Sequence, residues 1–384
     1  MNNLAIKEKR VNLGLTQKDF ADALGFGRNG ERTLRRWENG ETSPSKIELN
    51  AIMNFAANTP FPNVPEEQAD FTFIDLFAGI GGIRIPFSNL KGRCVLSSEW
   101  DKFAQKTYRL NFDDTPLGDI TKITNEEIPN FDILLGGFPC QPFSQAGLKK
   151  GFSDTRGTLF FEIERIIEAK RPKAFMLENV KQLKGHDKGR TLKTITEHLE
   201  KMNYEVRTKV LRAADFGVPQ NRERLFIIGY DKNLLSKNEE YTFSFPVPPK
   251  YPVKVGDILE SKVDLKYTIS DKLYEGHLRR KQEHLIRGNG FGFSLFDANS
   301  PYTNTLSARY YKDGSEILID CGKGKNPRKL TPRECARLQG FPDNFIIPVS
   351  DTQAYKQFGN SVAVPVVEAV ANMMIEELKR LHLI

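Results

Sequence analysis

Apolar and polar positions along the chain predict first a group of short helices and then strands and helices in alternation. In residues 1–56, apolar side chains recur at helical spacing, and the series is broken at Gly25, Gly27 and Asn39-Gly40. Beyond this segment, short apolar runs alternate with amphipathic stretches, which predicts an α/β fold with a doubly wound, mostly parallel sheet. The expected strands are 71–77, 93–98, 131–135, 173–178, 204–211 and 224–230, and the expected helices lie near 81–90, 101–111, 156–170 and 189–202.

Two proline-rich stretches divide the chain. One lies in residues 57–70, which contain few apolar side chains, and the other runs from Pro246 to Pro252. After the second, residues 253–325 are rich in Gly, Asn and Tyr and show weak periodicity, which indicates a small irregular β domain. Helical patterning returns at 330–338 and 362–381. The expected divisions are therefore a helical domain (1–56), a linker (57–70), an α/β domain (71–244), an insertion (245–325) and a return to the α/β domain (326–384).

The first 56 residues are typical of a helix-turn-helix. Thr16 is a good N-cap for a helix over 17–24, a glycine-containing turn follows, and the next helix, 31–37, is basic. The pattern LTQKDFADALG…TLRRWENGETSPS resembles the phage-repressor type of helix-turn-helix. That resemblance implies DNA contacts from the third helix, and a purely structural helical bundle is the alternative. The candidate DNA-binding residues here are Arg32, Arg35 and Arg36.

The charge of the chain permits an anionic partner. Among 384 residues, 56 Lys and Arg stand against 49 Asp and Glu, which gives a net charge of +7. Residues 271–340 hold thirteen of the basic and eight of the acidic residues, so much of the excess lies there. Nucleic acid is one partner that fits this distribution, and a solvated basic face is the alternative.

Nothing in the sequence indicates export, a membrane span or a metal site. Mean hydropathy is −0.46, no run approaches about 18 apolar residues, and charged residues at 7–10 occupy the place where a signal peptide is apolar. The four cysteines, Cys94, Cys140, Cys321 and Cys335, lack paired metal-ligand spacing. We therefore expect a cytoplasmic protein whose cysteines are thiols and which makes no contact with membranes.

A glycine-rich turn follows the first expected strand. The strand runs directly into Ala-Gly-Ile-Gly-Gly at 78–82, and turns of this kind bind adenosine-containing ligands at the carboxyl edge of a sheet. Its spacing differs from G-x-G-x-x-G, which disfavours a dehydrogenase. A tight turn with only a structural role is the alternative.

Acidic residues end successive strands near this turn. Glu99 lies 24 residues after Asp75, where its carboxylate can accept hydrogen bonds from both ribose hydroxyls, and Trp100 can stack on adenine. Asp119 supplies a third acid, suited to the adenine amino group. Packing alone does not account for three acids at successive strand ends, so we expect a cofactor that contains adenosine.

A second group of chemical residues lies farther along the same expected edge. Cys140 is in a Gly- and Pro-shaped loop, 136–144, just past the third strand. A lone buried cysteine is usually structural, but this loop places the thiol for chemistry. Glu178 follows thirty-eight residues later at the end of an apolar strand, and Arg222 and Arg224 precede the next one. A thiol, a carboxylate and guanidinium groups at adjacent strand edges can act as nucleophile, acid and anchoring cation.

Together these motifs resemble the bacterial DNA (cytosine-5)-methyltransferases. The matching segments occur in the family's order and cover residues 71–230 and 326–384, whereas 245–325 corresponds to the variable target-recognition domain. The chain shows no departure from the family pattern at a chemical position. The segments are DLFAGIGG (75–82), GFPCQPFS (137–144), ENV (178–180), QNRER (220–224), RKLTPRECARLQGFPD (328–343) and GNSV (359–362).

The resemblance implies a mechanism and a set of catalytic residues. Cys140 adds to carbon-6 of a flipped-out cytosine, which makes carbon-5 nucleophilic towards the methyl group of S-adenosylmethionine. Glu178 binds the ring nitrogen and the exocyclic amine, and Arg222 and Arg224 hold the base carbonyl and a phosphate and favour the thiolate. The expected cofactor-binding residues are Asp75, Phe77, Ala78, Gly79, Gly81, Gly82, Glu99, Trp100, Asp119, Ile120, Pro139, Leu159, Asn360, Ser361 and Val362.

Target DNA is expected to contact the catalytic loop and the insertion. The loop contributes Gln141 and Ser144, with Gly147 and Lys149 beyond them closing over the base. Tyr302-Thr-Asn-Thr-Leu-Ser resembles the Thr-Leu-Ser/Thr element beside the flipped nucleotide, and the residues after it are candidates for groove contacts. As a hypothesis, the site is of the CCNGG type. The candidates in the insertion are Thr305, Ser307, Arg309, Tyr310, Tyr311 and Lys312.

Three functions fit these patterns. The favoured one is a double-stranded DNA cytosine-5 methyltransferase that protects host DNA from a cognate restriction enzyme, acting as a monomer. The second, which can coexist with it, is a repressor of the chain's own promoter that binds an operator as a dimer through the helix-turn-helix. The third is an RNA (tRNA) cytosine-5 methyltransferase, because tRNA-acting relatives share these motifs.

Overall fold

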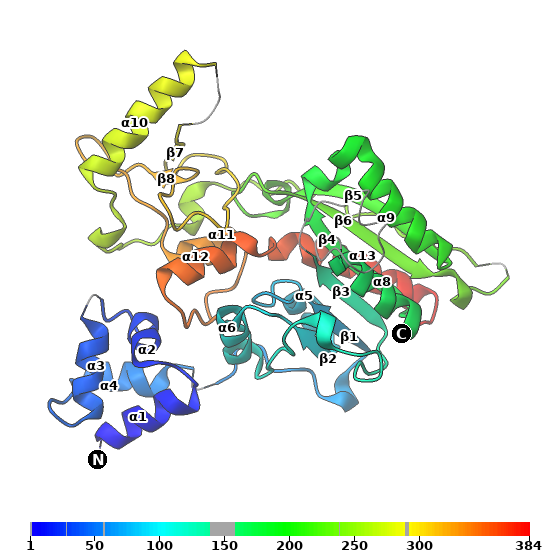
Figure 1. The fold of residues 1–384 in the computed structure, drawn as a ribbon, viewed down its shortest axis with the longest axis horizontal. Coiled ribbons are helices and arrows are strands. Elements are labelled where there is room, and N and C mark those ends of the chain that lie inside the picture. Colours follow the sequence, from blue (N-terminus) through cyan, green and yellow to red (C-terminus); the bar gives the residue numbers. More distant parts are fainter. Residues whose placement is uncertain (1, 28, 57, 139–157, 238, 289–291) are drawn as a thin grey trace. The chain divides into compact units, whose positions relative to one another are not determined.

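The computed structural model describes residues 2–27, 29–56, 58–138, 158–237, 239–288 and 292–384 (Figure 1). Its helices are α1 (Asn2–Asn12), α2 (Gln17–Ala23), α3 (Gly30–Glu38), α4 (Lys46–Asn54), α5 (Arg84–Asn89), α6 (Lys102–Phe112), α8 (Thr158–Lys170), α9 (Arg190–Lys201), α10 (Asp271–Ile286), α11 (Pro332–Leu338), α12 (Asp351–Asn360) and α13 (Val364–Arg380). Its strands are β1 (Phe71–Leu76), β2 (Gly92–Ser98), β3 (Ile133–Gly137), β4 (Ala174–Val180), β5 (Tyr204–Arg212), β6 (Glu223–Asp231), β7 (Leu295–Phe296) and β8 (Leu318–Ile319).

These elements form two compact units. The first unit comprises Met1–Pro62, Lys102–Thr115 and Lys254–Ser361, and the second comprises Asn63–Asp101, Pro116–Val253 and Val362–Ile384. This division follows packing, whereas the limits expected from the sequence follow function, so those limits stay a prediction. Each unit is described by itself below.

The second unit is built on a six-stranded sheet in the order β2-β1-β3-β4-β6-β5. β1 pairs in parallel with β2 and β3, and β3 pairs in parallel with β4. β6 is reversed, because it pairs antiparallel with both β4 and β5. The expected doubly wound, mostly parallel sheet is confirmed, with strand limits within two residues of those expected from the sequence.

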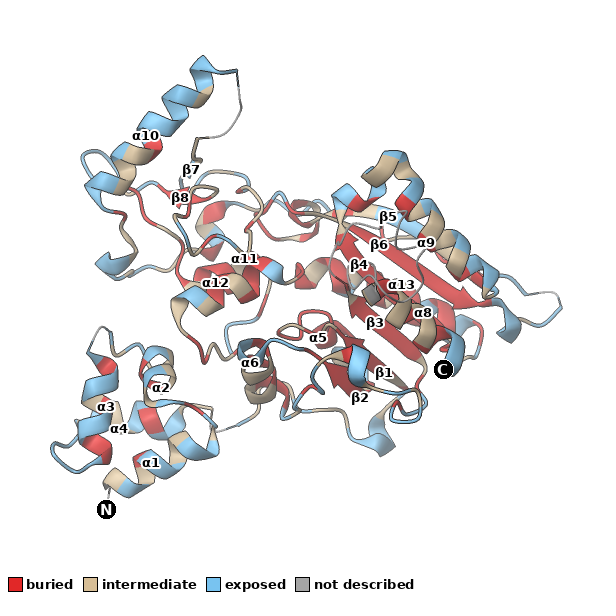
Figure 2. Cartoon of the chain, viewed as in Figure 1, coloured by how far each residue is buried: buried red, intermediate tan, exposed pale blue. Residues whose placement is uncertain are grey.

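Helices lie on both faces of this sheet (Figure 1), and its strands are largely buried (Figure 2). Successive side chains along a strand belong to two different buried cores, one on each face. Phe73, Ile133 and Met176 face a core that includes α5 and α13, whereas Leu134 and Phe175 face a core that includes α8 and α9. This period of two, with apolar residues on both faces, explains why the strands appear in the sequence as nearly continuous apolar runs. The result is a three-layer α/β/α unit that presents one edge of strand ends.

Asp132 ties three strands together at their amino-terminal ends. Its Oδ2 accepts hydrogen bonds from the backbone N–H of Thr72 at 2.7 Å and from the hydroxyl of Thr72 at 2.9 Å. Its Oδ1 is 2.6 Å from Nζ of Lys173, just before β4. Burial raises the pKa of Asp132, but Lys173 and Thr72 lower it more, so that the pKa lies below its ordinary value.

In the first unit, helices α1–α4 enclose a small core of Ile6, Leu15, Phe20, Ala21, Leu34, Trp37 and Ile52. The hydroxyl of Thr16 caps α2 by accepting from the N–H of Asp19, as the sequence predicted. Arg10 pairs with Glu38 at 2.6 Å, which links α1 to the end of α3. These four helices match the expected helix-turn-helix, with α3 as its basic helix.

Helix α6 packs against this helical core within the first unit. Lys106 is 2.5 Å from Oδ2 of Asp19, and Arg109 donates to the carbonyl of Leu13. On α6, Thr107 donates to Oε1 of Gln357 in α12 at 2.9 Å, and both side chains are buried. Helix α6 therefore holds the helix-turn-helix on one side and α12 on the other.

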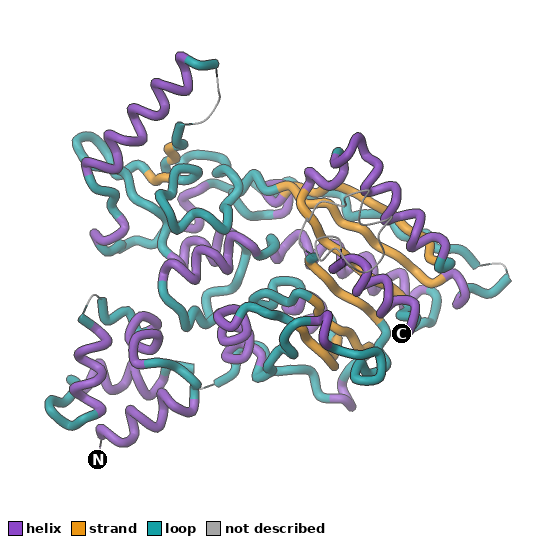
Figure 3. The backbone as a smooth tube through the Cα atoms, viewed as in Figure 1, coloured by secondary structure: helices purple, strands orange, loops and turns teal. Residues whose placement is uncertain are grey.

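The insertion differs from the expected irregular β domain. The strands that the structure describes within 253–325 are β7 and β8, which pair over two residues, whereas α10 extends over sixteen residues (Figure 3). The sequence prediction was wrong here because α10 has no apolar stripe: His277 is its buried residue, and most of its length is exposed (Figure 2). Helix α12 was also missed.

One stretch, Asp351–Arg380, is long and apolar enough by composition to cross a membrane, and 61% of the apolar window in it is buried inside the protein. It consists of α12 and α13, with non-helical residues between them. Burial of this kind is typical of core helices.

We expect Asp132→Asn to destabilise the protein by about 1–2 kcal/mol at pH 7, because a carboxylate that accepts charged and backbone donors is replaced by a neutral amide. A carboxyl group whose pKa is lowered on folding contributes stability above its unfolded pKa and loses that contribution as the pH falls through the folded value. The difference between variant and parent should therefore shrink below about pH 4. Urea unfolding at several pH values measures it.

Asp343→Asn is the matched control, because Asp343 also pairs with a basic side chain, Arg337 at 2.7 Å, but its own side chain is 65% exposed. We expect a much smaller change in unfolding free energy from this variant at every pH. An Asp132→Asn variant as stable as the parent at pH 7 would show that the contacts of Asp132 with Thr72 and Lys173 do not stabilise the fold.

Candidate active site

The turn after β1 is wound tightly against the end of β2. Phe77 has φ 55°, Gly79 has φ 55° and Gly81 has φ 83°, so three residues adopt left-handed backbone conformations. Such a conformation is strained for Phe77, and strain of this kind gathers at functional sites. The N–H of Ala78 donates to the carbonyl of Ser98 at 2.9 Å, which attaches the turn to the neighbouring strand. Ala78, Gly81 and Gly82 are buried, and Phe77 is half-buried.

Glu99 fastens this turn through its carboxylate. Oε2 accepts from the N–H of Gly79 at 2.8 Å, and Oε1 accepts from the N–H of Asp101 at 2.7 Å. Burial raises the pKa of Glu99, and these backbone hydrogen bonds oppose the rise. The neighbouring Trp100 is 80% exposed, so its ring face is open to a planar group.

A segment after α6 extends this edge. Leu117 forms a parallel bridge with Ser98, and the N–H of Glu99 donates to the carbonyl of Leu117 at 3.2 Å. Asp119 is half-buried, and its Oδ1 accepts from the N–H of Thr121 at 3.1 Å and from its hydroxyl at 2.9 Å. Ile120 is buried beside it. Two of the three predicted acids, Glu99 and Asp119, are therefore on adjacent extended segments.

Asp75 differs from these two acids. It lies inside β1, in register with Ser97 of β2 and Leu135 of β3, and it is fully buried. It is the residue before the last one of β1, so it lies within the sheet and not in the turn.

The residues present fit an adenosine-containing cofactor such as S-adenosylmethionine. The edge offers a buried carboxylate on Glu99, a second carboxylate on the adjacent segment at Asp119, and an exposed indole at Trp100. A glycine-rich turn lets a ligand approach the backbone closely. Leu159 at the start of α8 is half-buried in the same unit.

Glu178, near the end of β4, is buried beside two arginines. Nε of Arg224 is 2.9 Å from Oε1 of Glu178, and Arg224 lies opposite Val180 in the antiparallel pair of β4 and β6. Burial raises the pKa of Glu178, and Arg224 and Arg222 reduce the rise. A carboxyl group whose pKa is raised is a better proton acceptor than an exposed one and holds its proton to higher pH.

Arg222 is among the largest fully buried side chains in the described residues. Burial and repulsion from Arg224 lower its pKa well below the ordinary value, and attraction to Glu178 opposes this. Its backbone closes a short turn, because its N–H donates to the carbonyl of Gln220 and its carbonyl accepts from Ala213. The structure therefore brings Glu178, Arg222 and Arg224 together as the sequence predicted.

Asn179 is a site residue that we did not single out from the sequence. Its Nδ2 donates to the carbonyl of Phe138 at 2.9 Å, and both residues are buried. Phe138 is the last described residue before the expected catalytic loop, so Asn179 fixes the point from which that loop departs. A polar side chain at the end of an apolar strand was the available signal. Pro139, Cys140, Gln141, Ser144, Gly147 and Lys149 lie outside the described residues.

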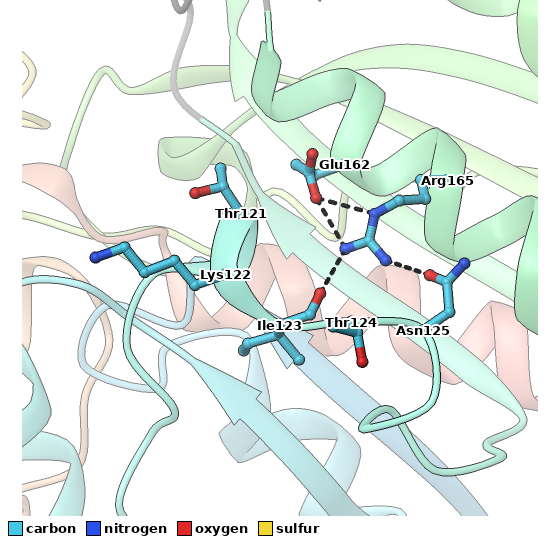
Figure 4. Close-up of a pocket in the computed structure, with 7 residues that line it drawn as sticks. All are labelled: Thr121, Lys122, Ile123, Thr124, Asn125, Glu162 and Arg165. Carbon is cyan, nitrogen blue, oxygen red and sulfur yellow. Dashed lines mark hydrogen bonds and ion pairs between the residues drawn. The ribbon is translucent and has the colours of Figure 1, made fainter.

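A surface recess lies beside the edge but takes no part in this arrangement (Figure 4). It is lined by residues 121–125 with Glu162 and Arg165 of α8. The guanidinium of Arg165 is occupied by Glu162 at 2.8 Å, by the carbonyl of Ile123 at 3.0 Å and by Asn125. Its charge is satisfied within the protein, so the recess is structural.

The remaining candidates are divided between the units. Asn360 is exposed, Ser361 is half-buried and Val362 is buried. Ser307 donates to Oε1 of Glu316 at 2.6 Å, and Arg309 is exposed. Arg32, Arg35 and Arg36 are exposed on α3, with Arg36 3.5 Å from Glu41. Thr305 and Tyr311 are half-buried, and Lys312 is exposed.

The prediction of a groove contact is wrong for Tyr310. Its side chain is fully buried, its hydroxyl donates to the carbonyl of Ile317 at 2.7 Å, and the N–H of Leu330 donates to that hydroxyl at 2.7 Å. A tyrosine whose hydroxyl is satisfied in the core cannot reach a base. Among the described residues, no group of His, Cys, Asp and Glu could hold a metal ion.

Comparison with known proteins shows which families the chain matches. Residues 71–376 match the family described as C-5 cytosine-specific DNA methylase, and residues 6–56 match the family described as Helix-turn-helix. The chain is 62% identical to the Type II methyltransferase M1.ScrFI of Lactococcus lactis subsp. cremoris, over 98% of this chain and 96% of that protein. It is 61% identical to the Type II methyltransferase M.SsoII of Shigella sonnei, over 97% of each.

The fold also resembles solved structures. The methyltransferase EhMeth of Entamoeba histolytica superposes with a TM-score of 0.66 at 22% sequence identity, over 81% of this chain and 99% of that one. This likeness concerns the fold alone. The matches of family and sequence extend over most of the chain, and the chain therefore belongs to the C-5 cytosine-specific DNA methylase family, as a methyltransferase that carries a helix-turn-helix domain ahead of its methylase domain.

Proposed function

We propose that the enzyme methylates carbon-5 of a cytosine in a specific double-stranded DNA sequence, with S-adenosylmethionine as methyl donor and Cys140 as transient nucleophile. The observation that carries this proposal is the buried group of Glu178, Arg222 and Arg224 at the carboxyl edge of the sheet. The carboxyl group of Glu178 can donate a proton to a neutral heterocycle, and the guanidinium groups can donate hydrogen bonds to a carbonyl oxygen of the same ring. Family membership supports the same activity.

The chemistry divides between the thiol and the carboxyl group. The thiolate of Cys140 forms a bond to carbon-6 of the ring while Glu178 supplies a proton to the ring nitrogen, so that electron density reaches carbon-5. S-adenosylmethionine, when bound, supplies an electrophilic methyl group. The donor would depart as S-adenosylhomocysteine. Solvent then takes the proton from carbon-5, the electron pair of that bond breaks the bond from sulfur to carbon-6, and Cys140 leaves as a thiolate. Glu178 takes back its proton from the ring nitrogen.

The raised pKa of Glu178 suits this role. A carboxyl group fully exposed to water is almost entirely ionised at pH 7 and is a weak proton donor. Burial raises the pKa of Glu178, and the positive charge of Arg224 reduces this rise. Arg222 and Arg224 also supply positive potential, which favours a nearby thiolate.

Access to a base in duplex DNA requires extrusion of the nucleotide. The target carbons are stacked inside the duplex, and flipping costs roughly a few kcal/mol. Contacts from the insertion, with Ser307 and Arg309 as candidates, and from Gln141 and Ser144 in the catalytic loop, would offset this cost. Our hypothesis for the recognised sequence is a site of the CCNGG type.

The biological role that we propose is protection of host DNA against a cognate restriction enzyme, because relatives at 62% and 61% identity are named Type II methyltransferases. We further propose that the helix-turn-helix binds the chain's own promoter. Arg32, Arg35 and Arg36 form an exposed basic surface on α3, the element that enters the major groove in such domains. The protein would methylate as a monomer and bind an operator as a dimer.

We expect Cys140→Ser to abolish methylation and to leave promoter binding unchanged, because the hydroxyl is a far weaker nucleophile and the helix-turn-helix is untouched. Bisulfite sequencing of host DNA, with and without the gene, reports activity and target together. Labelled cofactor offered with duplex DNA or with tRNA separates the alternative function: label in tRNA alone would reject our proposal.

Glu178→Gln should lower kcat by roughly 10²- to 10⁴-fold, because the amide cannot donate the proton that the carboxyl group supplies.

Arg224→Gln is expected to raise the pKa of Glu178 further, because Arg224 makes the largest contribution that lowers it. An NMR titration of the labelled carboxyl carbon would follow the midpoint. Arg212→Gln is the matched control, since Arg212 of strand β5 pairs with Asp215 at 2.6 Å and is not among the groups that shift the pKa of Glu178. A midpoint that falls, or that fails to move, would contradict the assigned electrostatics.

Replacing Arg32, Arg35 and Arg36 together by Gln should weaken promoter binding and reduce its salt dependence by about one counterion for each lost phosphate contact. Methylation of a promoter-free plasmid should be unaffected. Lys7→Gln on α1, also exposed, serves as the charge control. Gel-shift titrations at several salt concentrations measure both, and an unchanged salt slope in the triple variant would exclude α3 as the contact surface.

A further inference from the structure

The end of α12 contacts the backbone of the target-recognition segment at Gly359. Within the first unit, a Cβ atom on Gly359 would lie 2.3 Å from both the carbonyl carbon and the oxygen of Ser307. It would also lie 2.4 Å from the backbone nitrogen of Ala308. Real Cβ atoms essentially never approach within 3.0 Å of another atom in this way. Because the obstructing atoms are backbone, they cannot rotate aside, so only glycine permits this contact.

The helix cannot withdraw from the contact, because its last turn is held from two other directions. The carbonyl of Phe358 accepts from Nε2 of Gln339 at 2.7 Å in the core. Gln357 accepts from Thr107 of α6 at 2.9 Å. The N–H of Ser361 closes the helix on the carbonyl of Gln357 at 3.0 Å. Gly359 itself is buried between these anchors.

The opposite side of the contact is equally constrained. The hydroxyl of Ser307 donates to Glu316 at 2.6 Å, and the N–H of Arg309 donates to that hydroxyl at 3.1 Å. The carbonyl of Ser307, the group that faces Gly359, accepts from the N–H of Tyr310 at 3.1 Å. Tyr310 is itself fixed in the core through its hydroxyl. Two rigid segments therefore touch at one point with no side chain between them.

Close packing against a glycine can be ordinary core packing, as at Gly229, where a Cβ would meet the ring of Phe175. The contact at Gly359 differs in what adjoins it. Asn360, Ser361 and Val362 follow directly and are candidates for the cofactor. Thr305 and Ser307 on the other side are candidates for DNA. A shift of either segment along the contact must be accommodated by the other, because packed interiors transmit strain.

We propose that Gly359 is a positioning residue that couples cofactor binding to target recognition. This inference rests on the proposed function, since it takes residues 360–362 as cofactor-binding and 305–309 as DNA-binding. Occupation of one segment restricts the other through the backbone contact at Gly359 and Ser307. The affinities for the two ligands are then linked, and by thermodynamic necessity each ligand changes the affinity for the other by the same factor.

The test measures this linkage in the full chain. The probes are S-adenosylhomocysteine, which has no transferable methyl group, and a duplex that carries the site identified by bisulfite sequencing. In the parent, the duplex should tighten binding of S-adenosylhomocysteine by a factor of roughly 5–150. In Gly359→Ala, this factor should fall towards one, even where each separate affinity changes little. A factor equal to that of the parent would overturn the proposal.

Gly276→Ala is the matched control. Gly276 is also a helical glycine of the first unit, in α10, and a Cβ there would meet nothing within 4 Å. We expect this variant to keep the linkage factor of the parent. If Gly359 had only a structural role, Gly359→Ala would lower the melting temperature and weaken both ligands while leaving their linkage unchanged, and that result would reject our inference.

Amide hydrogen exchange in the unmodified protein provides a second test that does not depend on folding of a variant. Addition of S-adenosylhomocysteine alone should slow exchange at the N–H of Tyr310, which is bonded to the carbonyl facing Gly359. Addition of the duplex alone should slow exchange at Ser361. Binding of both ligands without either effect would refute the coupling. Failure of the parent to bind S-adenosylhomocysteine or to methylate DNA would instead refute the proposed function.

Discussion

The candidate active site, at the carboxyl edge of the sheet, depends on keeping the carboxylate of Glu178 and the guanidinium groups of Arg222 and Arg224 out of water. Charges removed from solvent are unfavourable unless they are paired, so burial of Glu178 is tolerated because Arg224 lies 2.9 Å away and Arg222 is close by. The same burial raises the pKa of Glu178 and lowers the pKa of both arginines, because it disfavours the charged form of each group. The site thus holds proton-transfer capacity and positive potential in one place, and the surrounding sheet supplies the rigidity that maintains the pairing.

The carboxylates near the glycine-rich turn have a different role. Each oxygen of Glu99 accepts a backbone hydrogen bond, one from Gly79 in the turn and one from Asp101. Asp119 caps the short helical turn that follows it. These hydrogen bonds to the backbone fix where each carboxylate lies at this edge of the sheet.

The sequence was sufficient for the sheet and for the grouping of Glu178 with Arg222 and Arg224, because both depend on local patterns. Short apolar runs in alternation with amphipathic stretches predicted the six strands, and polar residues next to these runs predicted Glu99, Glu178 and Arg224 as candidates, whose roles stay predictions. The insertion could not be predicted, because α10 buries one residue and carries no apolar stripe. Tyr310 was misjudged since nothing near it in sequence reveals that Ile317 and Leu330 bind its hydroxyl. The roles of Asn179 and Gly359 depend on Phe138 and Ser307, contacts between residues distant in the chain.

The reversal of β6 decides where its arginines can act. In a sheet whose strands all ran the same way, residues that precede a strand would lie at the edge opposite to those that follow one, and a nine-residue strand spans roughly 30 Å. Because β6 starts at the edge of the sheet where β4 ends, Arg222 just before β6 and Arg224 at its second position both lie near Glu178 at the end of β4. One inverted strand thereby replaces the long return loop that would otherwise have to carry both cations across the molecule.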